Sequence, residues 1–549
     1  MSRDIKHSSG HDHDSVDQTQ GQLKVVKIQL KLAKDHANRG SLYAQQQQWP
    51  DAIACYEKAI AIDPKFAGAY RNLARVFAKT GQQEEATECW YQALTLEPHW
   101  AKPEEHVKLG NRLWSLGKPD QAITCYRQAI ELKPNLLQVY YRLGEILKSQ
   151  GKMEDAIALY QQAVENNPRN HQAMNYYRQI VDSNPNPSAK DYHQLGQLLR
   201  GQSRFKEAIE SYQKAIELDP CFKRAYVDLQ YTWIESEQLE QLITFYRQCI
   251  ERQPDFPLAW GNLGDVLTEQ GQLEEAISCY QTSSYKTAVA SNPKLAEVHW
   301  KPKKEHGPDF VIIGAARCGT SSLYMYLSRY PQIISPHKKE LNFFSKYYNQ
   351  GIDWYLAHFP SITDYPNFLA GEASPNYFDC TESAQRMFQC FPKVKLIILL
   401  RNPVDRAISC YYHNFYHGRE KRSLEDSLAL EKQRLESLTE SDLLQIGYRH
   451  PNNLLGSLYV YKLKRWMEIF PREQFLIVKS EDFYSNTNTV MSTIIEFLGL
   501  SDQKFFQYPK CNGRSYTPII QELKQTLSDF FRPHNQKLED YLGMSFNWD

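Results

Sequence analysis

No stretch of this 549-residue sequence is apolar enough to cross a lipid bilayer, and neither sign of charge is in excess. The longest uninterrupted apolar runs, such as "LIILL" at 396–400, are far shorter than the roughly 20 residues that a transmembrane helix needs. Basic and acidic residues number 64 each, so overall charge gives no support for nonspecific binding to nucleic acid. An anion would have to be bound by a local cluster of residues.

Two further absences concern targeting and cysteine pairing. Residues 1–22 are polar and lack the apolar core of a signal peptide, which predicts a disordered tail there. The 11 cysteines form no CxxC pair, and their odd number without a secretion signal indicates a reducing compartment. The spacing of His and carboxylate residues suggests no metal site. We therefore expect a cytoplasmic protein with no membrane span and no metal.

The N-terminal half contains an internal repeat. Segments such as "DAIACYEKAIAIDP" (51–64) and "EAIESYQKAIELDP" (207–220) share an anchor position and a closing proline. By subtraction, successive anchors lie 34, 36, 34, 52, 34 and 34 residues apart; they are Ala52, Ala86, Ala122, Ala156, Ala208, Leu242 and Ala276. A period of about 34 residues is that of the tetratricopeptide repeat, a pair of helices joined by a turn.

This resemblance predicts an all-α superhelix of about seven repeats over 23–299, whose concave face binds a protein or peptide partner. The 52-residue step holds an added piece at 175–190, which we expect to be a helix followed by a loop. The last copy is five residues longer than its counterparts, which is expected to distort its second helix. The paired small and aromatic residues, such as Ala276 and Tyr280, are expected to serve packing.

The repeat pattern ends at "KPKKEHGP" (301–308), where charge and proline predict a linker over 300–308. From 309 to 549 the pattern changes to that of a second domain. "FVIIG" (310–314) is predicted to be a buried strand, followed by a tight turn and a helix that closes at Pro331. A turn that leads into a helix N-terminus presents backbone N–H groups to an anion.

The turn resembles a nucleotide-binding P-loop but differs from it at two positions. The Walker signature GxxxxGK[ST] has Lys after its second Gly, whereas this chain has Thr320 after Gly319. The apolar run 395–400 is followed by Arg401, where a P-loop enzyme would have an Asp that binds Mg²⁺. Arginine suits a phosphate monoester better than a metal ion. The site is thus predicted to hold two separated anionic groups, which disfavours an ATP-dependent kinase.

Both motifs resemble those of the sulfotransferases that use 3′-phosphoadenosine 5′-phosphosulfate (PAPS), with the closest likeness to heparan sulfate enzymes. The resemblance runs from about Phe310 to the C-terminus. It implies that the first loop holds the 5′-phosphosulfate, that "RNPVDRAISCYYH" (401–413) holds the 3′-phosphate, and that "CNGRSYTP" (511–518) closes over the nucleotide. The residues so assigned are Arg317, Cys318, Gly319, Thr320, Ser321, Ser322, Arg401, Ser409, Asn512, Gly513, Arg514, Ser515 and Tyr516.

The segment "KKELNFFS" (338–345) is similar to the one that bears the family's catalytic carboxylate. This likeness assigns proton acceptance from the acceptor group to Glu340. A helix cap or an ion pair with a neighbouring Lys is the alternative for Glu340. His337 and His413 are alternative bases, or else residues that serve the structure or contact the substrate. Likewise, Ser321 and Ser322 could act as helix caps instead of binding the donor.

The chain also departs from the family. Ala373 in "GEASPNYF" (371–378) stands where the heparan sulfate enzymes have Lys, so a second cation is absent or comes from Lys338 or Lys339. Asn512 stands where the closing loop usually has Lys, and Cys511 has no partner there for the family's disulfide. These differences bear on the acceptor rather than on the nucleotide.

The whole sequence predicts an α + α/β protein, a repeat superhelix followed by a P-loop-like domain with a central parallel sheet. The expected reaction moves a sulfuryl group from PAPS to a hydroxyl or amine, first of all on a carbohydrate, and releases 3′,5′-ADP. The repeats would recruit a partner or substrate. Sulfation of protein tyrosine, and an adaptor with a degenerate nucleotide site, are the alternatives. The missing membrane anchor separates the chain from Golgi enzymes and indicates a bacterial cytoplasmic protein.

Overall fold

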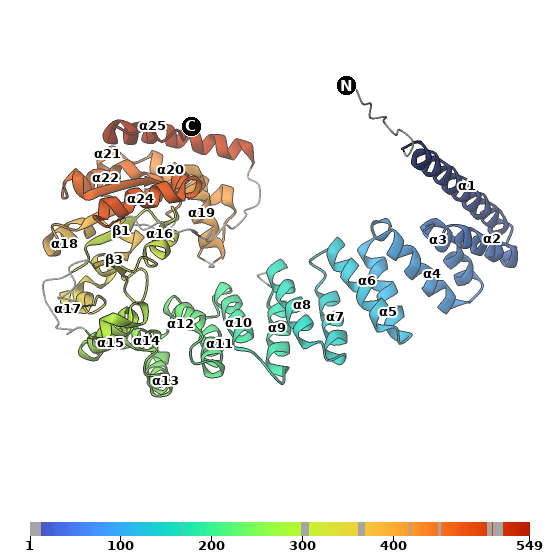
Figure 1. Cartoon of the computed structure of the whole chain (residues 1–549), viewed down its shortest axis with the longest axis horizontal. Helices are drawn as coiled ribbons and strands as arrows, with labels where there is room; N and C mark the ends of the chain where they lie inside the picture. Colours follow the sequence, from blue (N-terminus) through green and yellow to red (C-terminus); the bar gives the residue numbers. More distant parts are fainter. Residues whose placement is uncertain are drawn as a thin grey trace, which may run out of the picture. The chain divides into compact units, whose positions relative to one another are not determined.

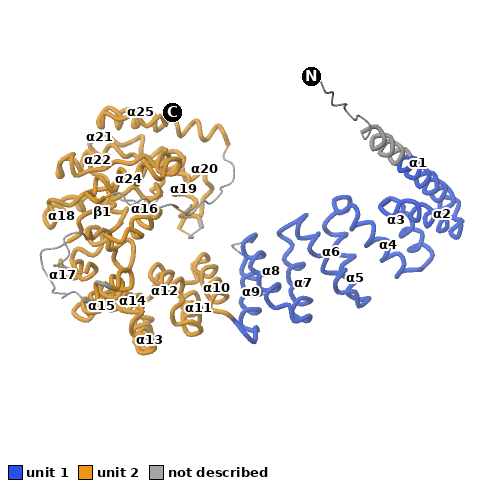
Figure 2. The backbone as a smooth tube through the Cα atoms, in the orientation of Figure 1, with its two compact units in different colours: residues 1–187 blue, residues 188–549 orange. Residues whose placement is uncertain are grey.

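The structure is a computed structural model that describes residues 12–167, 170–297, 307–360, 368–416, 419–447, 452–501, 508 and 520–548. The chain divides into two compact units, Met1–Pro187 and Ser188–Asp549 (Figure 2). This division differs from the predicted one. It falls among the repeats and not at residues 300–308, because the last repeats pack on the second domain and share its unit.

The first unit is built from helices, as the repeat predicts (Figure 1). A helix covers residues 12–22, where a disordered tail was expected, since α1 begins at Asp12. The piece added in the 52-residue step is helical as predicted and forms α9. The bounds are α1 (Asp12–Gln45), α2 (Trp49–Ile62), α3 (Ala67–Lys79), α4 (Gln83–Leu96), α5 (Pro103–Ser115), α6 (Pro119–Leu132), α7 (Leu137–Ser149), α8 (Met153–Asn166) and α9 (His171–Ser183).

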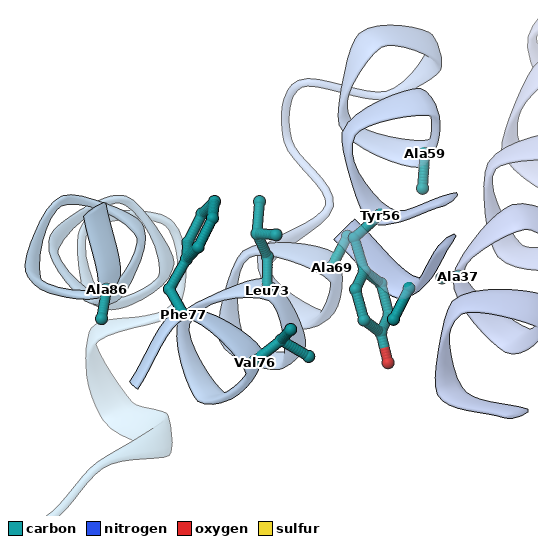
Figure 3. Packing of buried hydrophobic residues seen from close by; sticks show 9 residues of the cluster. Ala37, Tyr56, Ala59, Ala69, Leu73, Val76, Phe77 and Ala86 are labelled. Carbon is teal, nitrogen blue, oxygen red and sulfur yellow. The ribbon is translucent and has the colours of Figure 1, made fainter. Parts of the chain in front are cut away.

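Small and aromatic residues, together with aliphatic ones such as Leu73, make the core of the first four helices, as Figure 3 shows. Ala52 is completely buried, and the Tyr56 ring beside it is almost so. A Cβ atom at Gly40 would lie 2.9 Å from Cε1 of that ring, so the ring packs directly on the α1 backbone. All seven predicted anchors are buried, which confirms that they are packing positions.

The second unit starts with α10 (Ala189–Gly201), α11 (Phe205–Leu218), α12 (Lys223–Gln230), α13 (Leu239–Arg252), α14 (Pro257–Gln270) and α15 (Leu273–Ser291). Gly271 ends α14 with a φ of +85°, a backbone conformation that glycine adopts without strain. The predicted distortion of the last helix was wrong. α15 is a continuous helix of 19 residues, because its five additional residues extend it instead of bulging out.

A five-stranded parallel sheet follows, in the order β2-β3-β1-β4-β5. Its strands are β1 (Phe310–Gly314), β2 (Ile333–Ile334), β3 (Leu369–Ala373), β4 (Lys395–Leu400) and β5 (Phe475–Lys479). β1 is buried along its whole length, as predicted, which is typical of a parallel strand with helices over both faces. β1 pairs with β3 on one side and with β4 on the other.

The strand order makes the carboxyl ends of β1 and β4 a switch point. After β1 the chain builds β2 and β3 on one side and then crosses to β4 on the other, and open α/β sheets bind ligands at such a crevice. α16 (Thr320–Leu327) follows β1 and α19 (Pro403–Tyr416) follows β4; α16 ends four residues before the predicted Pro331. The remaining helices are α17 (Ile352–Leu356), α18 (Ser383–Cys390), α20 (Leu424–Glu436), α21 (Glu440–Gln445), α22 (Tyr459–Met467), α23 (Ser480–Ser485), α24 (Thr487–Leu498) and α25 (Gln521–Leu542).

Candidate functional site

The loop between β1 and α16 has the shape of an anion-binding turn. Gly319 has a φ of +100° and precedes the first residue of α16, and Arg317 also has a positive φ, of 72°. A Cβ atom at Gly319 would lie 2.9 Å from the Tyr484 hydroxyl, so a larger residue would be both strained and crowded. The turn thus leads into the N-terminus of α16, where the N–H groups of a helix's first turn can bind an anion.

The structure brings the two predicted anion motifs together. Arg317 Nε donates to Ser409 Oγ at 3.2 Å, and another guanidinium nitrogen lies 3.4 Å from Nδ1 of His413. Ser409 and His413 are four residues apart in α19 and so lie on one face of that helix. A residue of the β1 loop thus meets residues that are 92 and 96 positions later in the chain.

Arg401 directly follows β4, as predicted, and its side chain remains 31% exposed. A guanidinium nitrogen lies 4.0 Å from Asp405, which is a long ion pair. The Arg401 carbonyl accepts a 2.9 Å hydrogen bond from the Tyr459 hydroxyl, which fixes the backbone while the guanidinium stays accessible. Arg401 therefore retains the capacity to bind an anion at the sheet edge.

The hydroxyl residues at the start of α16 do not cap it. The N-cap residue is Gly319, which has no side chain to cap the helix, and Ser321 and Ser322 lie inside its first turn. Thr320 and Ser322 are buried, with Ser322 Oγ 3.5 Å from the Tyr484 hydroxyl, whereas Ser321 is exposed. The helix-cap alternative for Ser321 and Ser322 is therefore wrong.

The side chain of Cys318 points into the protein, unlike the partly exposed side chain of Arg317 before it. It is completely buried, with Sγ 3.6 Å from the Tyr459 hydroxyl, and burial raises the pKa of its thiol. Its carbonyl accepts a 2.5 Å hydrogen bond from Ser480 Oγ, at the start of α23. The Cys318 N–H donates to the Ala315 carbonyl at 3.3 Å, so both backbone groups of this residue have partners within the protein.

Arg406 holds the loop in place, and sequence reasoning missed it. Its guanidinium is buried and donates to the carbonyls of Ala316 at 3.0 Å, Asn452 at 2.7 Å and Asn453 at 2.9 Å. It lies in the same motif as Arg401, yet it points toward the protein and not toward solvent. The sequence contained no signal of this difference, because neither Ala316 nor the 452–453 backbone carries a recognisable partner group.

Glu340 lies at the same edge of the sheet. Its backbone N–H donates to the carbonyl of Ala373, the last residue of β3, at 3.0 Å, and its φ is +68°. Asn342 donates to the Glu340 carbonyl at 2.9 Å through its side chain and to Ser374 Oγ at 3.1 Å through its backbone. These bonds hold a partly exposed carboxylate beside the strand end, where an acceptor group could reach it.

The two lysines before Glu340 have different partners. Lys339 Nζ lies 2.5 Å from Glu340 Oε1, whereas Lys338 Nζ lies 2.5 Å from Oδ1 of Asp265 in α14. The structure therefore places Lys339, and not Lys338, next to the predicted catalytic carboxylate. The ion-pair alternative for Glu340 and its catalytic assignment are compatible, since the pair leaves the second carboxylate oxygen for other contacts.

Beside Ala373, which is buried in β3, a second carboxylate escaped the sequence analysis. Glu372 is completely buried and accepts hydrogen bonds from the hydroxyls of Tyr355 at 2.8 Å, Tyr377 at 2.9 Å and Ser374 at 2.7 Å. Burial raises the pKa of Glu372, while these donors act in the opposite direction. Through these bonds Glu372 links α17 to the residues that follow β3.

Other predicted features lie elsewhere. Asn512, Gly513, Arg514, Ser515 and Tyr516 are outside the described residues. Tyr459, Leu463 and Trp466 form one buried face of α22, which is a packing role. Each helix in the described ranges is too short or too polar to pass through a bilayer.

This domain has a parallel sheet with an arginine-bearing loop at the end of each of two adjacent strands, which defines a class of anion-binding α/β domains. Comparison with known families identifies the family within that class. Residues 307–512 match the family model of the sulfotransferase domain. Tetratricopeptide models match residues 40–81, 107–171, 189–220 and 245–278. The chain thus consists of tetratricopeptide repeats followed by a sulfotransferase domain, as the sequence predicted.

Curated relatives agree with this assignment. The chain is 28% identical over 312 residues to the membrane-associated sulfotransferase kil1 of Dictyostelium discoideum, and the match covers 44% of this chain and 66% of that protein. It is 32% identical over 279 residues to a bifunctional heparan sulfate N-deacetylase/N-sulfotransferase of Mus musculus, covering 44% of this chain and 31% of that protein. The chain therefore spans less than a third of the mouse relative's length.

Among solved structures, a sulfotransferase from Alicyclobacillus acidocaldarius is 32% identical. The match covers 44% of this chain and 99% of that one, with a TM-score of 0.36.

Proposed function

We propose that this protein is a sulfotransferase that moves a sulfuryl group from PAPS to a hydroxyl or amine acceptor, with a carbohydrate as the first candidate. The family match of residues 307–512 supports the reaction class. The observation that carries the donor assignment is the convergence of Arg317 with Ser409 at the switch point of the sheet. In this proposal Arg317 and the turn amides bind the 5′-phosphosulfate, and Arg401 with Ser409 binds the 3′-phosphate.

The chain's own residues account for the chemistry. The sulfur–oxygen bond to the donor phosphate breaks, a new bond forms to the acceptor oxygen or nitrogen, and 3′,5′-ADP leaves with the additional negative charge. Arg317 neutralises that charge, while Glu340 takes the proton that the acceptor loses. Lys339 orients the Glu340 carboxylate through their 2.5 Å contact. Catalysis in such a site is mainly positioning together with electrostatic stabilisation.

Donor binding is tested by calorimetry with 3′,5′-ADP and with 5′-ADP plus Mg²⁺, on the wild type and on Arg401→Ala. We expect Mg²⁺-independent binding of 3′,5′-ADP, weakened at least about tenfold in Arg401→Ala, because charge-assisted hydrogen bonds are lost. Preference for 5′-ADP with Mg²⁺, or equal affinity in the variant, would rule out the donor site.

Catalysis is tested separately with Glu340→Gln, which keeps the size of the side chain. Transfer of labelled sulfate should fall by about 10²- to 10⁴-fold while 3′,5′-ADP binding is unchanged. Binding without turnover in the wild type, against every acceptor offered, would favour an adaptor with a degenerate site.

The acceptor and the partners form the finer part of the proposal. Screening saccharides, peptides and lipids with labelled donor separates the alternatives, and labelling confined to peptide tyrosine would exclude the carbohydrate. The repeats are proposed to recruit a protein partner or substrate, since stacked repeats present extended binding surfaces. Cytoplasmic location in a bacterium stays a prediction from the sequence.

A further inference from the structure

The last repeats contact the loop that carries Glu340. The Tyr231 hydroxyl donates to the Lys339 carbonyl at 2.9 Å, directly before Glu340. Lys338 pairs with Asp265 of α14, as described above. Further along the loop, the Tyr347 hydroxyl donates to Glu269, also of α14, at 2.7 Å. The repeats thus form part of the surroundings of the proposed catalytic residue.

A shortened repeat helix opens a cavity at this place. α12 has 8 residues, whereas the first helices of the neighbouring repeats, α10 and α14, have 13 and 14. The chain leaves the helix after Gln230, and the non-helical residues that follow carry Trp233, which is 68% exposed. The cavity of about 200 Å³ is bordered by this segment, by α14 and by the loop after Lys338.

The cavity walls combine aromatic rings with hydrogen-bonding groups. Trp233 and Tyr347 present rings, while Gln230, Asp265 and Glu269 present amide and carboxylate groups. Asp265 Oδ1 accepts from Lys338 and from the Tyr280 hydroxyl, but its Oδ2 is buried without a partner in the described structure. Because that oxygen is enclosed by protein, a ligand hydroxyl would bond instead to the exposed carboxylate of Glu269.

The charges of the cavity offset one another. Lys338 is paired with Asp265, and Lys346 lies 3.4 Å from Glu269, so these four groups sum to zero. Such walls offer no excess of positive charge to an anionic ligand. A ring with hydroxyl groups and one apolar face suits them, because it can stack on an aromatic side chain and donate to carboxylates.

We propose that this cavity is an acceptor subsite and that it takes an uncharged sugar unit. The proposal rests on the proposed sulfotransferase function and adds that the repeats, through Trp233 and α14, contact the acceptor. The loop from Lys338 to Glu340 connects the cavity to the proposed catalytic carboxylate. With a volume of about 200 Å³, the cavity would take one sugar ring of the acceptor.

The experiment measures binding of uncharged methyl glycosides (glucoside, galactoside and N-acetylglucosaminide) to the full chain by saturation-transfer NMR. Glucuronic acid serves as the anionic comparison and N-acetyl-tyrosine amide as the peptide comparison. The variants are Trp233→Ala and Glu269→Gln, both at partly exposed positions that should fold. Trp114→Ala is the matched control, since Trp114 is an exposed aromatic residue of α5 in the other unit.

We expect an uncharged glycoside to bind the wild type and to bind about three- to tenfold more weakly in Trp233→Ala, because a stacking contact is lost. Glu269→Gln should weaken it as well, and Trp114→Ala should not. Equal binding in Trp233→Ala, binding of only the acid or the tyrosine amide, or no glycoside binding would overturn the subsite. Calorimetry with 3′,5′-ADP on the same samples reports the donor site independently, so a failed subsite is distinguishable from a failed sulfotransferase assignment.

Discussion

At the scale of single residues, burial distinguishes two arginines of one motif, Arg401 and Arg406. Arg406 is buried and donates to three backbone carbonyls, so its charge is used inside the protein. Arg401, five residues earlier, is nearly a third exposed, and within the described residues its side chain has only a long ion pair. Both belong to the same motif, but their contacts differ. Replacing Arg406 should therefore affect stability, whereas replacing Arg401 should affect anion binding.

Replacing Arg406 by Leu should destabilise the unit that contains the domain. Three buried carbonyls would lose their donor, which should lower the free energy of unfolding by about 3–5 kcal/mol. Urea denaturation followed by tryptophan fluorescence measures this. Arg401→Ala is the control, and it should change the free energy by less than about 1 kcal/mol. Equal effects of the two variants would show that the Arg406 contacts contribute little.

At the scale of elements, the Glu340 loop and α14 fit each other closely. The ring of His337 lies against the α14 backbone at Gly261, where an added Cβ atom would come within 2.3 Å of Cδ2. The same ring stacks on Tyr280 of α15 and on His358, which follows α17. A loop of the domain is thus inserted between two helices of the last repeat.

Gly261→Ala should therefore destabilise this contact, by about 1–3 kcal/mol, because a packed interior tolerates additional atoms poorly. His337→Ala removes the atoms that the new methyl group would meet. In a double-mutant cycle of urea unfolding, the double variant should be more stable than the sum of the two single effects predicts. Additive effects would mean that the helix and the loop do not touch in solution.

The histidines of this contact predict a dependence on pH. His358 is completely buried, and burial, with further contributions from His337 and Lys338, keeps its pKa well below the ordinary value. Its Nδ1–H donates to the Trp354 carbonyl at 2.9 Å, and this bond raises the pKa by less than burial lowers it. Burial lowers the pKa of His337 in the same way.

A histidine whose pKa is lowered by folding contributes fully above its unfolded pKa of about 6.5, and its contribution is lost as pH falls below that value. The unfolded chain then binds a proton that the folded chain does not. At pH 5.5 the loss from His358 should be about 1.4 kcal/mol. Urea unfolding at pH 7.5 and 5.5 measures it, and His358→Phe should reduce the difference by that amount. An unchanged difference would contradict the neutral, buried histidine.

At the scale of the whole chain, the compact units do not coincide with the two family matches. The last repeats belong to the same unit as the sulfotransferase domain, while the earlier repeats form the other unit. Segments that share many contacts unfold together, whether or not they belong to the same repeat array. The same substitution in the two groups of repeats should therefore destabilise different parts of the chain.

Leu143 in α7 and Leu267 in α14 are both completely buried and allow a matched comparison. Each Leu→Ala change should lower the free energy of unfolding by about 2–5 kcal/mol. Leu267→Ala should accelerate hydrogen exchange in the sulfotransferase domain. Leu143→Ala should accelerate hydrogen exchange only in the first unit. Hydrogen exchange with mass spectrometry measures both. If Leu267→Ala left exchange in β1 and β4 unchanged, the last repeats would have to unfold separately.

Much of this architecture could be predicted because it depends on local patterns. The 34-residue period required small residues such as Ala52 and Ala276 at helix contacts, and both are buried there. The apolar run of β1 and the residues that follow it had to form a strand and a turn whatever the remaining chain did. The positions of Arg317 and Arg401 at the ends of β1 and β4 follow directly from these local elements.

Which residues a side chain contacts could not be predicted, because the partners are far apart in the sequence and local patterns do not show what comes together on folding. Lys338 pairs with Asp265, 73 residues earlier, while the adjacent Lys339 pairs with Glu340, and both lysines have the same chemistry. The inward direction of Arg406, the burial of Glu372 and the short helix α12 likewise depend on which surfaces meet after folding. Periodicity and strand-end motifs are properties of the chain, whereas the division at Pro187 and the contact between repeats and the Glu340 loop are properties of packing, because only the folded chain brings these residues together.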